Sequence, residues 1–237
     1  MPTIDASNVA TVAGSGTSWS TSWVAVRDAA TGSAIDASSD GSDMGHYRFY
    51  ARGAYFFYIY RVFAAFDTSA ADLGIAPSEA TLQVYGRTSS SATAADFFIV
   101  KGTQGAGDPA RADWDAIAGW DTSTGADGSG AGDQESNITT ANGFYSAEWV
   151  TGTTAWNESG YNDITLNATA RADMASGDAL YICMIESVHD LRDDNSTGSP
   201  INGLYFDDDL GKVMRIDYTA GVAASATDNA VFFGTNF

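Results

Sequence analysis

The sequence predicts an all-β fold: a two-sheet antiparallel β-sandwich of jelly-roll type, with about ten strands and very little helix. The densest run of aromatic and β-branched residues covers 55–67, and residues 80–87 alternate between apolar and polar side chains, as a half-buried strand does. Further short apolar segments are separated by Gly-, Ser- and Asp-rich stretches that are typical of turns. No internal repeat of about 20 to 50 residues is present, which argues against a propeller or a solenoid.

The expected elements follow in order along the chain. Residues 1–16 are small and polar and indicate an N-terminal arm or a leading edge strand, and residues 17–28 are the first strand candidate. A glycine at position 53 separates the next two segments, as in a hairpin or a bulged corner. Short helices are expected at 111–117 and at 167–174, the second ended by Gly177. The remaining strands are predicted at 46–52, 55–66, 80–87, 96–101, 144–151, 162–166, 179–186, 203–206 and 212–218.

The chain divides into one domain with two flanking segments. Residues 17–219 make the β-sandwich domain, and residues 220–237 are a C-terminal arm or an edge strand of the same sheet. Apolar residues beyond a finished domain favour a contact with a partner, so Phe232, Phe233 and Phe237 are candidate docking residues. The Gly- and Asp-rich loop over 102–143 is long for a compact domain, which indicates a function or a partner that holds it.

Charge excludes two classes of partner. The formal net charge of −19 repels phosphate backbones and anionic headgroups, so we expect neither nucleic acid nor a membrane as partner. A hydrophobic content of 44% excludes a disordered chain, and no apolar run is long enough to span a bilayer. No secretory signal is visible at the N-terminus. The single Cys183 cannot form an internal disulfide, so we expect it to pack as a small apolar residue.

Catalytic patterns are weak throughout the sequence. A serine nucleophile needs a positioned base, but the chain has only His46 and His189 and no G-x-S-x-G motif. The segment 211–213 lacks the rest of a P-loop, and one cysteine with two distant histidines does not suit zinc. With thirty acidic residues, some carboxylate pair always lies close enough for glycoside hydrolysis, so such pairs carry no information. We therefore expect no enzyme activity.

Two kinds of ligand remain open. No cofactor is expected apart from a Ca²⁺ ion, because residues 193–198 partly match an Asp-x-Asn-x-x-Gly loop, although the closing Glu of an EF-hand is missing. The candidate ligands are Asp193, Asn195, Asp207 and Asp209; the alternative is a set of solvated acidic turns. Aromatic platforms bind sugars in β-sandwich modules, and the candidate glycan-binding residues are Trp114, Trp120, Trp149 and Trp156. The alternative is that these four are buried anchors of the long loop.

Ordered sequence blocks carry a resemblance to a known family. Residues 58–69 read YIYRVFAAFDTS and residues 77–86 read PSEATLQVYG; further blocks lie at 160–169 and 177–182, with Asp190 and a closing RIDY at 215–218. This set resembles the DNRLRE-like, carbohydrate-binding-module-like jelly rolls found in bacterial surface proteins and in virion proteins of tailed phages. No binding residue is carried over, because the second block lacks the family's basic residue and the long loop is expanded. Within these blocks we expect Arg61 to pair with a carboxylate, and Asp67 or Thr68 to cap a turn.

The resemblance implies a non-enzymatic virion structural protein of a tailed bacteriophage. It would be a capsid decoration (cement) protein or a component of an appendage, located in the virion after assembly in the host cytoplasm. The partners expected are other virion proteins, such as the major capsid or tail proteins, and further copies of the chain in a homo-oligomer. The alternative is a carbohydrate-binding module that recognises glycans on the host surface.

Overall fold

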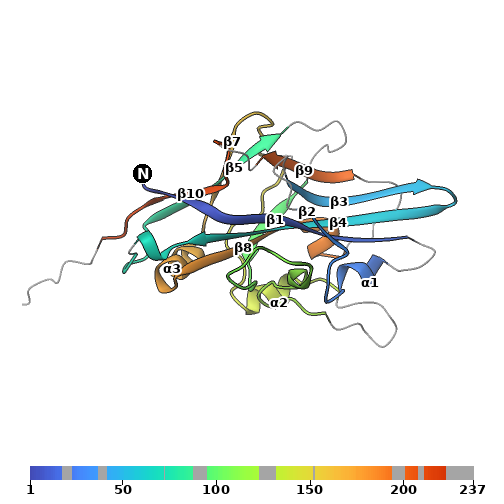
Figure 1. Cartoon of the computed structure of the whole chain (residues 1–237), viewed down its shortest axis with the longest axis horizontal. Helices are drawn as coiled ribbons and strands as arrows, with labels where there is room; N and C mark the ends of the chain where they lie inside the picture. The colour runs from blue at the N-terminus through green and yellow to red at the C-terminus, as the bar shows by residue number, and fades with distance from the viewer. Residues whose placement is uncertain are drawn as a thin grey trace, which may run out of the picture.

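Ten antiparallel strands run through the described part of the chain and form one continuous hydrogen-bonded sheet that folds over itself (Figure 1). The computed structural model describes residues 1–17, 23–36, 42–71, 73–87, 95–122, 132–151, 153–193, 201–207 and 211–222. This confirms the predicted all-β antiparallel sandwich. The strands are β1 (Thr3–Thr17), β2 (Ala34–Asp36), β3 (Ser42–Ala51), β4 (Ala54–Asp67), β5 (Glu79–Arg87), β6 (Phe97–Lys101), β7 (Tyr161–Thr165), β8 (Ala179–Glu186), β9 (Ile201–Asp207) and β10 (Arg215–Thr219).

The sheet has β4 as its central strand. One edge of β4 pairs with β1 over most of its length, and the other edge pairs first with β3 and then with β8. From β3 the pairing continues through β9, β5 and β10 and returns to the start of β1. β1 pairs with β10 at residues 3–5 and with β4 from Ala6 onward, and a register shift lies between Ala6 and Asn8. This irregularity lets one strand contribute to both layers of the sandwich.

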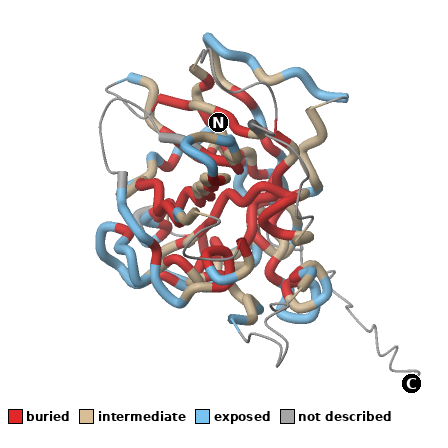
Figure 2. The backbone as a smooth tube through the Cα atoms, turned by 90° about the vertical axis from the view of Figure 1, so that its right-hand side faces the viewer, coloured by how far each residue is buried: buried red, intermediate tan, exposed pale blue. Residues whose placement is uncertain are grey.

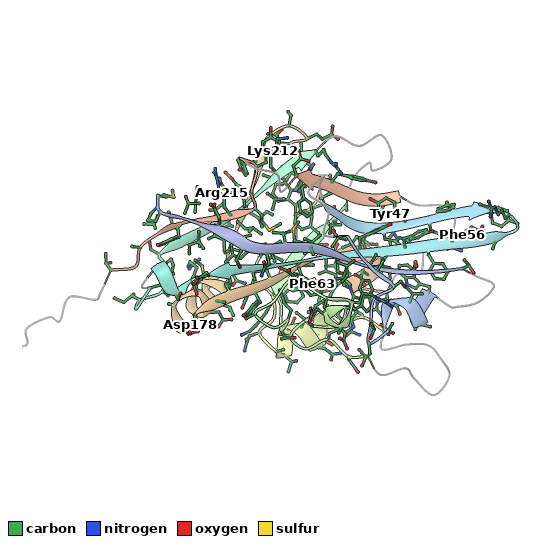
Figure 3. The ribbon with its side chains drawn as sticks, viewed as in Figure 1. Tyr47, Phe56, Phe63, Asp178, Lys212 and Arg215 are labelled. Atoms are coloured by element: carbon green, nitrogen blue, oxygen red, sulfur yellow. The ribbon has the colours of Figure 1, made fainter. Side chains whose placement is uncertain are left out.

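Alternate side chains of β4 enter two different apolar cores. Val62, Ala64 and Phe66 belong to the first core, which residues of β5, β7, β9 and β10 complete from the opposite layer. Phe63, labelled in Figure 3, and Ile59 point to the other face and belong to a second core. Because successive side chains of a strand point to opposite faces, both cores use the same strand. Figure 2 shows the resulting concentration of buried backbone in the interior.

Short helical segments cover the second core, on the side of the sheet where Figure 1 shows α1 and α2. Trp23 and Val26 of α1 face this core, and Ile138 of α2 is fully buried in it. The helices are α1 (Trp23–Arg27), α2 (Glu135–Thr140) and α3 (Ala168–Ser176), with 3₁₀ turns η1 (Ser69–Ala71) and η2 (Arg111–Asp113) and a single π-helical turn η3 (Ser187–Leu191). The helix predicted at 167–174 is confirmed as α3, with the Asn167 side chain as its N-cap.

Three expectations about elements are corrected. Of the two alternatives for residues 1–16, an arm or a leading edge strand, the structure has a strand, but β1 pairs with β4 and with parts of β10 and β2, and its Ala10 and Val12 are buried in the core. The strand expected over 17–28 is wrong, because β1 ends at Thr17 and the described residues 23–27 are helical, with buried Trp23 and Val26 spaced for one helix face. The segment 144–151 makes only isolated bridges to β6, since the Ser146 hydroxyl accepts the Ile99 N–H that a strand carbonyl would otherwise accept.

Candidate functional site

Arg61 is a fully buried arginine in the middle of β4, on the face of the second core. Its Nε lies 2.8 Å from Asp190 Oδ2 and its Nη2 lies 2.7 Å from Asp190 Oδ1, a bidentate pair. Nη1 donates to the carbonyl of Trp114 at 2.6 Å, and Nη2 also donates to the carbonyl of Arg27 at 3.1 Å. The expected pairing of Arg61 with a carboxylate is therefore confirmed, with Asp190 of η3 as the partner.

Two tryptophan rings lie against this guanidinium. The Arg61 Cζ atom is 4.0 Å from the ring centroid of Trp114 and 4.0 Å from that of Trp120. The Trp114 indole N–H donates to the carbonyl of Arg27 at 3.1 Å. Cation–π contacts of a desolvated guanidinium are among the stronger ones in proteins. The rings thus stabilise the buried charge and connect the long loop to β4.

A second buried arginine extends the network. Arg27, at the end of α1, pairs with Asp28 at 3.0 Å and lies 3.7 Å from an oxygen of Asp193. It also donates to the carbonyls of Asp190 and Leu191 in η3, the second at 3.2 Å. The two arginines therefore join α1, β4, the long loop and η3 through bonds to carboxylates and backbone carbonyls. Charged groups held in this way act as internal cross-links, since each is desolvated and paired.

A small cluster of titratable groups lies beside the network. Glu186 is fully buried at the end of β8, where its Oε2 accepts the backbone N–H groups of His189 and Asp190, and burial raises its pKa to about 7. His46 is 1% exposed; burial, then the charges of His189 and Arg48, lower its pKa to about 3. Its ring lies 4.5 Å from that of His189 and 4.4 Å from that of Trp23. Because these groups are buried, they contact the core and not solvent.

The β3–β4 hairpin presents exposed aromatic and basic side chains. In Figures 1 and 3 it projects at one end, with Phe56 on its outer part. Arg52 and Gly53 connect Ala51 to its partner Ala54, and their φ angles of 51° and 82° are those of a type I′ turn. One face of the hairpin carries an aromatic stripe, which we define as Tyr47, Phe49, Phe56, Tyr58 and Tyr60.

The rings of the aromatic stripe lie nearly parallel to one another. Phe49 stacks on Phe56 at 5.4 Å and on Tyr58 at 6.1 Å, with interplanar angles of 7° and 9°. Tyr58 and Tyr60 follow at 6.3 Å and 13°. Phe49 is 41% exposed, so the outer part of the stripe reaches the surface. On β1 the residues opposite Tyr60, Tyr58 and Phe56 are Ala13, Ser15 and Thr17, which have small side chains.

The hairpin is also basic. Residues 44–66 contain three arginines and neither Asp nor Glu, in a chain with a net charge of −19. Arg61 is buried, whereas Arg52 is exposed at the turn and the Arg48 guanidinium lies 4.2 Å from the ring centroid of Tyr55. Tyr50, on the same face as Arg48, is 60% exposed. This combination was not predicted from the sequence, although the absence of Asp and Glu from the aromatic residues 44–66 can be seen there.

The four tryptophans predicted as a glycan platform do not share one surface. Trp114 is fully buried, and Trp120 packs beside it against the second core. Trp149 and Trp156 pack against the first core, with their ring centroids 6.0 Å apart. The two cores lie on opposite faces of β4, so the four rings form no common platform; Trp114 and Trp120 anchor the long loop, as the alternative held, whereas Trp149 and Trp156 lie outside that loop.

The predicted calcium ligands and docking residues are only partly described. Asp207 is 7% exposed and pairs with Lys212 at 2.7 Å and with Arg87 at 3.6 Å. Asp193 lies beside Arg27, and burial raises the pKa of its carboxyl. Among the described residues, no group of three or more His, Cys, Asp or Glu side chains suits a metal ion. Outside the described residues lie Asn195, Asp209, Phe232, Phe233 and Phe237, so the calcium site and the tail contact stay predictions.

Comparisons with protein-family models, with curated proteins and with solved structures found no match for this chain. In the described part of the chain, no helix has the length and apolar character needed to cross a membrane.

Proposed function

We propose that the chain is a non-enzymatic virion structural protein of a tailed bacteriophage, either a capsid decoration (cement) protein or an appendage component, which acts through protein–protein contacts. The observation that carries the proposal is the division of its chemistry between interior and surface. The interior holds the paired arginines and the acid–base groups, while the projecting hairpin presents aromatic and basic side chains. Aromatic residues and Arg are the side chains enriched where proteins bind one another.

Two further features support a structural role. The groups that could act as acid and base, Glu186, His46 and His189, are buried in the core, where they do not face the surface at which a substrate would arrive. The strongly acidic surface keeps crowded copies apart except where a specific contact forms, which suits a protein displayed at high copy number. The resemblance of residues 17–219 to virion jelly rolls points to the same role.

The test is to look for the chain in particles. Virions purified from a phage that encodes it would be analysed by mass spectrometry and by cryo-electron microscopy. We expect a fixed copy number per particle and sandwich-shaped density on the head or on an appendage. Particles that lack both the peptides and the density would contradict the proposal.

The alternative, a carbohydrate-binding module that recognises host glycans, is favoured by the aromatic stripe. The stacked rings, with Phe49 41% exposed, give an apolar aromatic surface against which the apolar face of a sugar ring can pack. A glycan array followed by isothermal titration calorimetry tests it, with the Phe49→Ala/Tyr58→Ala variant as the comparison. Saturable binding by the wild type that this variant loses would support the module. Absence of any saturable glycan signal would remove it.

A further inference from the structure

The two ends of β4 have opposite character. At its start, the β3–β4 hairpin presents Arg48 and Arg52 with exposed aromatic rings. At its end, Asp67 helps to line a groove of about 440 Å³ together with Asp178, which Figure 3 places at the opposite end of the molecule. Both carboxylates are exposed, and the other lining residues are uncharged. A basic projection and an acidic groove thus occur on one chain.

We propose that the hairpin of one copy docks in the acidic groove of the next copy, in a head-to-tail contact. This inference rests on the proposed function, because it names the partner for one of the protein–protein contacts. We define the acidic groove by its residues Ser7, Asn8, Ala65, Asp67, Ser69, Ala106, Asp178, Ala179 and Tyr181. Most of these side chains are small, so the groove has room for the aromatic and guanidinium groups of a hairpin tip.

The groove cannot be filled by the hairpin of its own molecule. β4 has 14 residues, and a strand rises by about 3.3 Å per residue, so the two features lie roughly 45 Å apart on one extended strand. The strand is fixed on both edges by β1, β3 and β8, so it cannot fold back. Charge complementarity therefore selects a second copy as the occupant. Such a heterologous contact repeats from copy to copy and produces a ring or a filament.

The residue at the turn supports a role beyond local structure. The first position of a type I′ turn needs a left-handed backbone, for which Asn and Asp are the preferred non-glycine residues. This chain has Arg there, with φ of 51°. A residue that opposes the local preference at an exposed tip is expected at a functional position. Arg52 is exposed at the turn, and Arg48 is partly exposed beside the Tyr55 ring.

The test is sedimentation velocity on the full chain at a series of concentrations. We expect reversible oligomers at about 0.05 M salt that weaken at about 0.5 M, where screening shortens the range of charge attraction. The hairpin variant Arg48→Glu/Arg52→Asp and the groove variant Asp67→Asn/Asp178→Arg should each weaken self-association by about a hundredfold or more. Asp67 accepts the Ser69 N–H at 3.0 Å, and the amide oxygen that Asp67→Asn introduces can still accept it, so the turn is kept in the groove variant.

Mixing the two variants makes the test specific. In the mixture, the acidic hairpin of the hairpin variant meets the more basic groove of the groove variant. The basic hairpin of the groove variant meets the acidic groove of the hairpin variant. Both contacts join opposite charges, so a 1:1 mixture should assemble although each variant alone does not. The control Glu158→Gln/Asp163→Arg changes the net charge as the groove variant does, but at exposed positions outside the groove, and it should assemble like the wild type. Circular dichroism and the melting temperature establish that each variant is folded.

The outcomes separate this inference from the proposed function. A wild type that stays monomeric at all concentrations overturns the head-to-tail contact, as does a folded groove variant that assembles normally, or a mixture that stays monomeric. Presence of the chain in virions is a separate measurement. Self-association of a chain that is absent from virions would contradict the proposed function alone. Presence in virions of a chain that does not self-associate would contradict the head-to-tail contact alone.

Discussion

Replacement of Asp190 by Leu leaves the buried Arg61 guanidinium without its carboxylate. Both side chains are fully buried, and both carboxylate oxygens take part, at 2.8 and 2.7 Å. Removing one partner of a buried pair costs about 3 to 5 kcal/mol, because the other charge stays desolvated and uncompensated. That loss is a large share of the roughly 5 to 15 kcal/mol by which domains are stable.

The magnitude is worked out by a double-mutant cycle. Arg61→Met should cost about as much as Asp190→Leu, since it leaves the carboxylate unpaired in the same environment. The double variant should cost no more than either single one, which gives a coupling free energy of about 3 kcal/mol or more. Arg61→Lys keeps the charge but loses the bidentate bond and the stacking on Trp114 and Trp120, so its free energy of unfolding should fall between those of the wild type and Arg61→Met.

The assay is urea unfolding followed by tryptophan fluorescence and circular dichroism, with the slope against urea checked for constancy. The control is the Lys101–Asp173 pair, which has a similar distance of 2.9 Å but side chains that are 39% and 29% exposed. Lys101→Met should cost at most about 1 kcal/mol. An Asp190→Leu variant that loses no more stability than Lys101→Met would refute the buried-pair explanation, as would a double variant that shows the sum of the two single costs.

Three further predictions follow from local chemistry. The pKa of His46 is lowered to about 3, so between about pH 6.5 and 3 the unfolded chain binds a proton at His46 that the folded chain does not, and the free energy of unfolding falls as the pH falls. Urea unfolding at a series of pH values should show that His46→Phe reduces the slope of the free energy of unfolding against pH by about 1.4 kcal/mol per pH unit. An unchanged slope would contradict the lowered pKa. Arg52→Asn should raise the melting temperature, because Asn suits the left-handed turn position, while self-association falls; a lower melting temperature would count against the turn assignment. Asn167→Ala should lower the free energy of unfolding by about 0.5 to 2 kcal/mol, because Asn167 caps α3 by accepting the Ala170 N–H at 3.0 Å and also donates to the Phe144 carbonyl at 2.7 Å; urea unfolding that gives wild-type stability would contradict this role.

Much of the fold could be predicted from the alternation of apolar and polar side chains. Residues 80–87 alternate because one face of β5 lies on the first core and the other does not, and the structure has that strand at Glu79–Arg87. The turn after β4 was also readable, since Asp67 Oδ1 accepts the Ser69 N–H as the expected cap. Features of this kind depend only on residues that are close in the sequence, so the sequence predicts them.

Features that depend on contacts between distant segments could not be predicted from side-chain alternation. The small polar residues of β1 carry no strong strand signal, and they form a strand because two neighbouring strands pair with their backbone. Burial of Trp114 depends on Arg61, which is 53 residues away along the chain. The pairing of Arg61 with a carboxylate was predicted, whereas the layout of the network around Arg27 and η3 depends on how loops from distant segments meet.

The construction of β4 links the buried network to the proposed contact. The same strand carries the Arg61 cross-link in its middle, the hairpin at its start and a side of the acidic groove at its end. Pairing on both edges and two cores on its faces hold the strand in one conformation, so the hairpin meets a partner already ordered. A preorganised element loses little conformational entropy on binding, which favours a specific contact from a small area. Loosening β4 through Asp190→Leu should therefore weaken self-association even in molecules that remain folded, although Asp190 is buried and lies outside the acidic groove.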